Sequence, residues 1–286
     1  MFVVAGVTGN TGSVVAETLL ERKQRIRVIV RTPEKGEIWQ EKGAEVAVAS
    51  LEDSQALANA FDGAAGAYLL VPPNYKASDY LEDRRRTTDA LATAVEVSGL
   101  PHVVFLSSIG AHLATGTGPI QALHYAERRL VAIARSLTIL RAPYVMENCV
   151  PVLGAARIQG SLPSFFSPGR KIPMIATRDI GHMAAECLLD RCKGKRVLEL
   201  LGPAEYSPED VAKAVGRHLG REVSVQQLPL TAVVPTFTSI GFTENVARLF
   251  EEMYRGMETG RIRFEGQGAA HPRGLVTLAE GLSGRF

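Results

Sequence analysis

Short runs of apolar residues alternate with longer amphipathic stretches through the first half of the chain. The apolar runs, each long enough for one strand, lie at 2–7, 26–31, 44–50, 65–73, 102–111 and 137–145. Strands that are nearly all apolar and are separated by helices indicate a parallel sheet that is covered on both faces. Because such crossovers are right-handed, the alternation predicts an α/β fold with a doubly wound parallel sheet, the Rossmann arrangement.

The clearest of the intervening helices is predicted over residues 79–98. Leu91 and Val95 lie one turn apart on its apolar face. Gly99 follows directly and Pro101 comes two residues later. A glycine with a proline shortly after it is a typical helix end, so we expect the helix to stop there.

The pattern of apolar positions changes after about residue 150. Residues 160–173 are rich in turn formers, and a helix over 179–190 and a strand over 196–202 then resume the alternation. The last part, 206–286, reads as helices and loops, with Ser207 as the N-cap of the first helix. We therefore predict a Rossmann domain made of residues 1–149 plus about 174–202, and a smaller, mostly helical C-terminal substrate lobe made of residues 150–173 and 203–286.

The turn after the first predicted strand contains three glycines, Gly6, Gly9 and Gly12, immediately before a helix. In this context the first glycine allows a tight turn, the second lets the backbone approach a pyrophosphate, and the third permits close contact between helix and strand. The helix N-terminus offers free N–H groups and a partial positive charge. Further donors come from the side chains of Thr8, Asn10 and Thr11. The alternative is a tight turn that binds no ligand.

The end of the second predicted strand indicates which dinucleotide would bind. An NAD site usually places an acidic residue there, to bind the ribose 2′-hydroxyl. This chain has Arg31, with Lys35 one turn further on. An arginine presents forked donors that suit a 2′-phosphate, so we predict NADP(H) in preference to NAD(H). The alternative is a solvated arginine that follows a strand.

The charge of the chain excludes some classes of partner. A formal net charge of +2, with 22% charged residues, is too small an excess to indicate nucleic-acid binding. The run Arg84 to Arg86 falls within the predicted 79–98 helix, and we interpret it as a solvated helix face.

The cysteine and histidine content and the hydropathy bear on metals and on the compartment. Three cysteines, Cys149, Cys187 and Cys192, are too few for a disulfide framework, and reduced thiols are expected. The six histidines form no ligand-spaced pair, so no metal site is predicted. No segment has the roughly 18 consecutive apolar residues of a membrane span, and the chain opens on a strand-like run without a leader. We expect a cytoplasmic protein without membrane contact.

Five motifs in order along the chain carry a resemblance to a known family. They are GVTGNTGS, VRTPEK, VVFLSSIGA, LTILRAPYVMEN and IATRDIGHMAAECLL. Together they resemble the NmrA-like atypical short-chain dehydrogenases/reductases, and the resemblance covers nearly the whole chain. The pattern is most similar to the bacterial NADPH quinone-oxidoreductase and triphenylmethane-reductase-like branch, whose members reduce quinones or dyes. Other NmrA-like proteins bind the cofactor as redox-responsive regulators.

The resemblance implies a set of cofactor-binding residues. Gly6, Thr8, Gly9, Asn10, Thr11 and Gly12 match the phosphate loop of the family, and Arg31 matches its 2′-phosphate residue, with Lys35 nearby. The family pattern also places Leu70, Val71 and Pro72 beside the ribose next to the nicotinamide, Ser107 and Ser108 at the usual serine position, and Tyr144 at the entry to the substrate lobe. The family commonly has an acid at the end of the third strand, where this chain has Ser50. Adenine recognition is therefore left open between backbone groups and Asp53.

Two residues are candidates for catalysis. Many short-chain dehydrogenases use a tyrosine with a lysine four residues later, and this chain has Tyr125 with Arg129 at that spacing. His124 is a rival proton donor, because imidazole titrates near neutral pH. The branch that the chain resembles generally does without the tyrosine pair, so Tyr125 has an alternative as a helix-surface or pocket residue. A quinone requires little from the protein, since the cofactor supplies the chemistry and water can complete protonation.

A quinone-like acceptor would need an apolar slot with a few polar groups beside the nicotinamide. The residues that we expect to form its walls are Tyr75, Tyr144, Phe165, Phe166 and Phe237, and Asn148 lies where the chain enters the substrate lobe. For each of the aromatic residues, ordinary core packing is an equally good explanation.

These observations favour an NADPH-dependent reductase of a quinone-like or other conjugated small molecule. Two alternatives stay open: an NADP(H)-binding redox sensor without turnover, and a tailoring oxidoreductase of secondary metabolism, for example of an aromatic polyketide. The expected partner is a small-molecule substrate, with a homodimer left open and a protein partner in the case of a sensor.

Overall fold

The structure, a computed structural model, describes residues 1–190, 193–266 and 269–285. Its centre is a seven-stranded sheet in the order β10-β6-β5-β4-β1-β2-β3, and every neighbouring pair is parallel. The strands are β1 (Phe2–Val4), β2 (Ile26–Val30), β3 (Glu45–Val48), β4 (Gly66–Leu70), β5 (Val103–Ser108), β6 (Leu137–Ala142) and β10 (Lys195–Glu199). The predicted doubly wound parallel sheet is confirmed.

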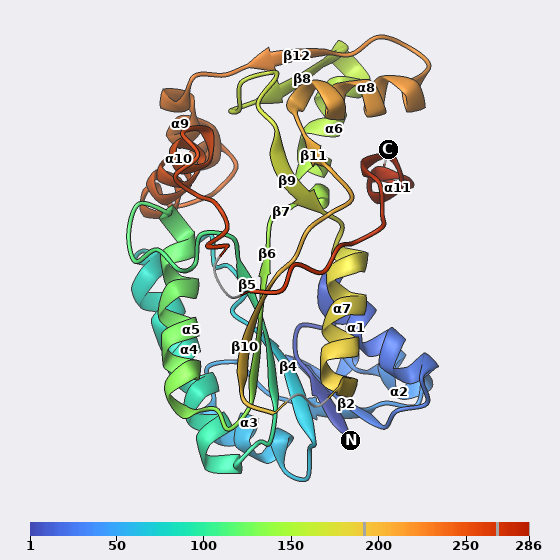
Figure 1. The fold of residues 1–286 in the computed structure, drawn as a ribbon, viewed down its shortest axis with the longest axis vertical. Coiled ribbons are helices and arrows are strands. Elements are labelled where there is room, and N and C mark those ends of the chain that lie inside the picture. The colour runs from blue at the N-terminus through green and yellow to red at the C-terminus, as the bar shows by residue number, and fades with distance from the viewer. Residues whose placement is uncertain (191–192, 267–268, 286) are drawn as a thin grey trace.

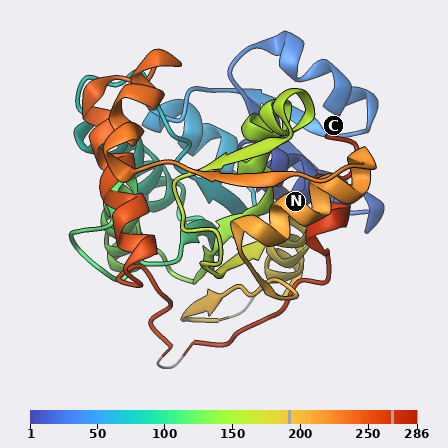
Figure 2. The same ribbon diagram turned by 90° about the horizontal axis from the view of Figure 1, so that it is seen from above.

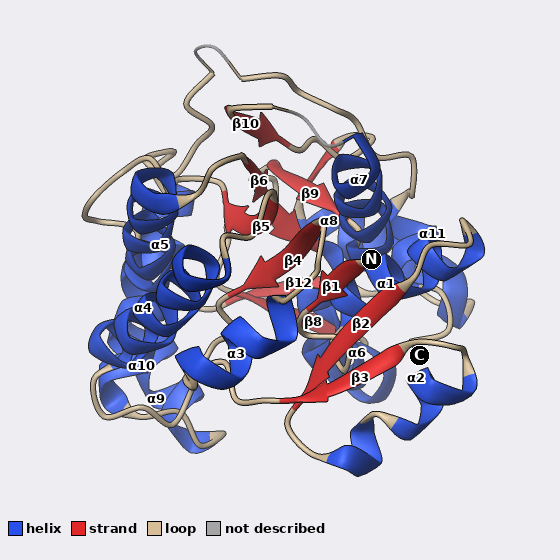
Figure 3. Cartoon of the chain, turned by 90° about the horizontal axis from the view of Figure 1, so that it is seen from below, coloured by secondary structure: helices blue, strands red, loops and turns tan. Residues whose placement is uncertain are grey.

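Helices cover both faces of the sheet, as Figure 3 shows. The helices on one face are α3 (Ser54–Phe61), α4 (Tyr80–Ser98) and α5 (Gln121–Ile133), and those on the other are α1 (Asn10–Glu21), α2 (Glu37–Glu41) and α7 (Thr177–Asp190). Each face has its own apolar core, because both sides of the nearly all-apolar strands are buried. Helix α4 ends at Gly99, whose φ of 61° is left-handed, as the glycine there predicts.

A second lobe lies beyond the carboxyl ends of the sheet strands (Figure 1). Its helices are α6 (Val150–Gln159), α8 (Pro208–Leu219), α9 (Val233–Ser239), α10 (Glu244–Glu258) and α11 (Leu278–Leu282). Two small sheets accompany them: β7 (Tyr144–Val145), β9 (Ile172–Ile175) and β11 (Glu205–Tyr206) form one, and β8 (Ser161–Ser164) and β12 (Ser224–Gln227) form the other. Ser207 caps α8 in a reciprocal capping box with Asp210. Seen from above, the β8–β12 pair and α8 lie over the central sheet (Figure 2).

The structure differs from the expected elements at three places near the lobe. One is strand β12, which lies in the region 206–286 that was expected to hold only helices and loops. The run 137–145 is interrupted at Pro143, which has no N–H for a ladder, so β6 ends at Ala142 and β7 joins the sheet of the lobe. Residues 160–173, expected to be turns, contain β8 and the start of β9. The division into two domains stays a prediction. Its boundary at residue 174 falls inside β9, and residues 270–274 return to run beside β10.

Candidate functional site

The order of the strands predicts a ligand crevice at the carboxyl edge of the sheet. From β1 the chain builds β2 and β3 toward one side, and β4, β5, β6 and β10 then extend the other side. The direction of winding therefore reverses between β1 and β4, and the loops that follow these two strands diverge. In open α/β sheets, ligands bind in the crevice at such a switch point.

The three glycines of the loop after β1 have the conformations and contacts that a phosphate loop requires. Gly6 has a φ of +69°, and a Cβ there would lie 2.7 Å from Cδ2 of Leu70. A Cβ on Gly12 would lie 2.4 Å from the carbonyl oxygen of Gly6, so only glycine allows α1 to approach β1 this closely. At Gly9 the nearest atom to a Cβ is 3.3 Å away, and this residue is exposed at the crevice.

The N-terminus of α1 presents unbonded donors beside these glycines. Gly9 is the N-cap and provides no side-chain acceptor, and the first turn contains no acidic residue. Within the described residues, the amides of Asn10, Thr11 and Gly12 have no hydrogen-bond acceptor. Because these N–H groups and the helix dipole favour an anion, this corner can bind a pyrophosphate.

Side chains of the loop divide into free and engaged groups. Thr8 and Asn10 are exposed. Thr11 accepts a hydrogen bond of 2.9 Å from the phenol of Tyr68, which is fully buried under the loop. Burial raises the pKa of Tyr68 well above its usual range, so the phenol keeps the proton that it donates to Thr11. Tyr68 therefore anchors the start of α1.

Arg31 and Lys35 both lie at the carboxyl end of β2, next to β1. Arg31 follows the last residue of the strand, and Lys35 ends the short 3₁₀ helix η1 (Pro33–Lys35). Both side chains are exposed, and neither forms an ion pair with any described residue. They are available to an anionic group beside the phosphate loop, which is the arrangement that a 2′-phosphate needs.

The loop after β4 borders the crevice on the other side. Leu70 ends β4 beneath Gly6, and Val71 and Pro72 continue from it half-buried. The run Arg84 to Arg86 on α4 lies close to this loop, and its interpretation as a uniformly solvated face is wrong. Arg85 and Arg86 have side chains that are 55% and 62% exposed, but Arg84 is only 5% exposed. Its guanidinium donates to the carbonyl oxygen of Pro72.

The two serines that end β5 face opposite sides of the sheet. Ser107 is buried, and its hydroxyl donates a 2.5 Å hydrogen bond to Glu127 of α5. Glu127 in turn pairs with the buried Arg141 at 2.7 Å, and Arg141 reaches Glu265 at 2.6 Å. The geometry does not support the expected cofactor contact through the Ser107 hydroxyl, because that group is committed to this ion network. Ser108 is half-buried and donates to the carbonyl oxygen of Ile109.

The acidic residues after β3 are likewise engaged. Asp53 caps α3 and accepts hydrogen bonds from the amides of Gln55 and Ala56. Ser50 accepts a hydrogen bond from the amide of Glu52. Asp53 thus has a structural function that its position in the sequence does not by itself reveal.

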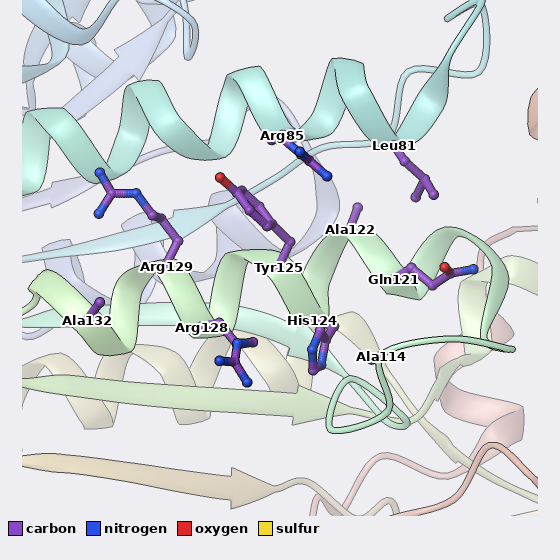
Figure 4. Close-up of a pocket in the computed structure, with 10 residues that line it drawn as sticks. All are labelled: Leu81, Arg85, Ala114, Gln121, Ala122, His124, Tyr125, Arg128, Arg129 and Ala132. Carbon is purple, nitrogen blue, oxygen red and sulfur yellow. The ribbon is translucent and has the colours of Figure 1, made fainter.

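The structure does not bring the two catalytic candidates, Tyr125 and His124, to the crevice. Ala126 and Leu130 are the residues of α5 that pack toward the sheet, and Tyr125 points instead toward α4, as Figure 4 shows. Its hydroxyl donates to Asp89 at 2.8 Å, and its ring lies 5.0 Å from the guanidinium carbon of Arg85. The proposed catalytic role of Tyr125 is therefore corrected to that of a residue between two helices.

His124 is held by the segment that follows β5. Its Nδ1 donates to the carbonyl oxygen of Ala111 at 2.8 Å. Both His124 and Tyr125 line an open groove of about 410 Å³ on the outer side of α4 and α5 (Figure 4). The groove also contains Arg85, Arg128 and Arg129, and it is separate from the residues of the phosphate loop. The expectation that His124 donates a proton in the crevice is not supported by this position.

The expected aromatic walls form one continuous group of rings. Tyr75, from the β4–α4 loop, stacks on Phe242 with ring centroids 4.3 Å apart, and Phe242 contacts Phe237 at 4.9 Å. The chain of contacts continues through Phe165 and Tyr254 to Phe166 and Tyr144. We call this group the aromatic cluster; its members are Tyr75, Tyr144, Phe165, Phe166, Phe237, Phe242, Phe250 and Tyr254. Asn148 is exposed on η3 (Met146–Cys149) and takes no part in it.

Two phenols form the polar part of the aromatic cluster. Tyr144 and Tyr254 both pack against Phe166, with ring centroids 5.8 and 5.1 Å from it. Burial raises the pKa of Tyr254 to about 12, and burial raises the pKa of Tyr144 well above its usual range. Burial also raises the pKa of the nearby Cys149 thiol to about 12. All three groups therefore stay protonated at neutral pH.

Other features of the described residues bear on metals, thiols and membranes. Cys149 and Cys187 are buried and form no disulfide with any described residue, and Cys192 lies outside the described residues. In the described parts of the chain, no three His, Cys, Asp or Glu side chains gather as a metal site would need. Nor does any described helix combine the length and the apolar character required to cross a membrane.

The sequence signature of the NmrA-like family matches residues 1–269. Quinone oxidoreductase 2 of Escherichia coli is 23% identical over 293 residues, an alignment that covers 100% of this chain and 99% of that protein. The solved structure of an NADPH-dependent quinone oxidoreductase from Escherichia coli in complex with NADPH is similar, with a TM-score of 0.81 and 23% identity over 99% of both chains. Triphenylmethane reductase from Citrobacter sp., solved in complex with NADP(H), has a TM-score of 0.82 and 18% identity over 100% of both chains. These structural likenesses show a shared fold.

Proposed function

This chain belongs to the NmrA-like family, and we propose that it is an NADPH-dependent reductase that transfers hydride to a quinone-like or other conjugated small molecule. The observation that carries the proposal is the set of unbonded amides at Asn10, Thr11 and Gly12, which lie in the crevice beside the free guanidinium of Arg31. The names of the similar proteins support it: a quinone oxidoreductase and a triphenylmethane reductase, both solved with the phosphorylated cofactor.

The residues of the crevice fit NADPH. The exposed backbone at Gly9 and the free N–H groups at the N-terminus of α1 would hold the pyrophosphate. Gly12 lets α1 approach β1 closely enough for this, because a side chain there would push the helix away from the strand. Arg31, with Lys35, would hold the 2′-phosphate. The loop from Leu70 to Pro72 would border the ribose next to the nicotinamide. When bound, NADPH supplies a hydride from its nicotinamide ring.

The aromatic cluster would hold the acceptor. Its members come from the loop after β4, from β7, from the loop between β8 and β9, and from α9, α10 and the turn that joins them. The cluster would therefore extend across the nicotinamide side of the carboxyl edge. Flat aromatic walls suit a conjugated ring and exclude water. The hydroxyls of Tyr144 and Tyr254, both protonated at neutral pH, offer a hydrogen bond to a carbonyl oxygen. Reduction of a quinone to a hydroquinone then needs one hydride and one proton, and the proton can come from water.

A direct assay tests the proposal. The protein is mixed with NADPH and a panel of quinones and triphenylmethane dyes, and oxidation of NADPH is followed by absorbance. Turnover is expected. Tight binding of both NADP⁺ and NADPH without turnover on any acceptor would instead identify a redox sensor, and the absence of binding would contradict both functions.

A cytoplasmic location accords with the reduced thiols of Cys149 and Cys187.

A further inference from the structure

Arg84 is a buried cation near the start of α4, and two exposed arginines, Arg85 and Arg86, follow it directly. Its side chain is 5% exposed, whereas the next residue, Arg85, is 55% exposed. A buried guanidinium is costly unless its donors are satisfied. The contacts of Arg84 therefore indicate what this position requires.

The first set of contacts ties α4 to the loop that follows β4. Nη1 of Arg84 donates to the carbonyl oxygen of Pro72 at 2.5 Å, and its Nε donates to Oδ2 of Asp83 at 2.9 Å. The same oxygen of Asp83 accepts a 3.2 Å hydrogen bond from Nδ2 of Asn74. Asn74 Oδ1 then accepts from the amide of Lys76. Arg84 and Asp83 together hold both the start and the middle of the 71–76 loop.

The electrostatics of this pair favour its ionised form. Burial alone would raise the pKa of Asp83, but hydrogen bonds and charge from Arg84 outweigh it, and the pKa is lowered from its usual range. Asp83 is therefore a carboxylate at neutral pH. It can accept from Arg84 and Asn74 at once because an ionised carboxylate has several acceptor positions.

A second set of contacts reaches the loop that follows β3. Nη2 of Arg84 lies 3.8 Å from Oε1 of Glu52, and the same oxygen accepts a 3.2 Å hydrogen bond from Thr87. The strand order places β3 and β4 on opposite sides of β1 and β2. One guanidinium thus links the two loops that border the crevice at either side of the phosphate loop and Arg31.

We infer that Arg84 is a positioning residue for NADPH: it fixes the 71–76 loop against α4 and the β3–α3 loop, so that the nucleotide crevice is preformed. The inference rests on the proposed function. A lysine could replace it only in part, because the three N–H donors of an ammonium share one nitrogen, whereas Nε, Nη1 and Nη2 of Arg84 face three separate acceptors from one planar fork. The 71–76 loop follows Leu70, the last residue of β4, which lies directly under Gly6. Displacement of the loop would therefore reach the phosphate loop.

The test compares Arg84→Met and Arg84→Lys with Arg85→Met, which removes a neighbouring arginine from the surface. NADPH affinity is measured by calorimetry, and KM for NADPH and kcat are measured with a quinone. Losing one charged hydrogen-bonding group that preorganises the site should raise the Kd and KM for NADPH roughly tenfold in Arg84→Met. The change in kcat should be smaller, because what is lost is binding common to ground and transition states. The Kd and KM for NADPH of Arg84→Lys should lie between those of Arg84→Met and the wild type, and those of Arg85→Met should match the wild type.

Hydrogen exchange of the ligand-free protein supplies a readout that does not need the cofactor. The amides of Asn74, Tyr75 and Lys76 should exchange faster in Arg84→Met but not in Arg85→Met. Asn74→Ala removes one link to the loop without unpairing a buried charge, and it serves if Arg84→Met does not fold. If Arg84→Met folds and binds NADPH with wild-type affinity, the inference is overturned. If Arg84→Met does not fold, wild-type NADPH affinity and wild-type hydrogen exchange in Asn74→Ala would overturn it. If the wild type itself failed to bind NADPH, the proposed function would be overturned first, and the inference with it.

Discussion

The loop between β1 and α1 and the groove between α4 and α5 both carry residues that the sequence suggested for chemistry, but they offer different groups. In the loop, the amides of Asn10, Thr11 and Gly12 have no acceptor among the described residues, and the side chains of Thr8 and Asn10 are exposed. In the groove, Tyr125 already donates to Asp89 and His124 to a backbone carbonyl. The loop presents unused donors to the crevice, whereas the groove has paired side chains on an outer surface.

The difference shows which kind of site a sequence motif defines. The phosphate loop is made by backbone conformation, and glycines at the right spacing between a strand and a helix determine that conformation. A tyrosine on a helix is defined by the direction of its side chain. That direction depends on which face of α5 meets the sheet, and here Ala126 and Leu130 occupy that face. Tyr125 is adjacent in sequence and therefore points elsewhere.

The largest expected effect comes from filling the space at the third glycine. Gly12→Ala would place a Cβ 2.4 Å from the carbonyl oxygen of Gly6, so α1 must move away from β1. We expect a loss of about 1–3 kcal/mol of stability and NADPH affinity at least roughly tenfold weaker, measured by denaturant unfolding and calorimetry. Gly154→Ala in α6 is the control, since a Cβ there meets nothing within 4 Å. NADPH affinity in Gly12→Ala equal to that of the wild type would mean that the loop does not hold the cofactor.

A charge reversal at Arg31 should have the next largest effect. Losing a charge-assisted bond of about 1.5–3 kcal/mol should reduce the preference for NADPH over NADH by roughly tenfold or more, and Arg31→Glu should reverse it. The ratio of kcat/KM for the two cofactors is the measurement. Arg217→Glu, the same change at an exposed position of α8, should leave the ratio as it is. Unchanged selectivity in Arg31→Glu would remove the assignment of the 2′-phosphate site.

In the groove, removal of the Tyr125 hydroxyl should have little effect on the reaction. Because the hydroxyl is bound to Asp89, Tyr125→Phe should change kcat/KM by less than about twofold and stability by less than about 1 kcal/mol. Steady-state kinetics with NADPH and a quinone check this. A fall of about 100-fold or more, the size of a lost general acid, would show instead that the tyrosine reaches the reaction.

The smallest effect concerns pH. Burial, followed by the hydrogen bond to Asp89, raises the pKa of Tyr125 above 10. The folded protein thus keeps a proton that the unfolded chain releases, so this contribution to stability is complete below pH 10 and is lost as pH rises through the folded pKa. Measured by chemical unfolding at pH 9 and above, the free energy of unfolding should fall slightly less steeply with rising pH for Tyr125→Phe than for the wild type. An equal or steeper loss would place the hydroxyl in a more solvated setting.

Much of the fold could be predicted because local pattern and global architecture agree. The apolar runs became the strands of the central sheet, and Gly99 and Ser207 end and begin helices as their types indicate. The boundary near Pro143 was missed because the run 137–145 looks continuous, although its two parts pair with different sheets. The short strands β8 and β12 pair only with each other, and their sequences carry turn formers or polar residues.

The candidate site was predictable only in part, because features that depend on tertiary packing have no local sequence pattern. The phosphate loop follows from the glycine spacing, and the aromatic walls were suggested by residue type, although Phe242, Phe250 and Tyr254 join them only through tertiary packing. Arg84 looks identical to Arg85 and Arg86 in the sequence. Its burial depends on the position of Pro72 and Glu52, which are distant along the chain. Burial of a charged residue between loops has no local sequence signal.

Calorimetric titration of the ligand-free wild-type protein with NADPH and with NADH tests the central claim most directly. The unbonded amides at the start of α1 and the free Arg31 predict that both nucleotides bind at one site and that NADPH binds roughly tenfold more tightly or better. Equal affinities would contradict the assignment of Arg31. No detectable heat with either nucleotide, on protein shown to be folded by circular dichroism, would contradict the dinucleotide site itself.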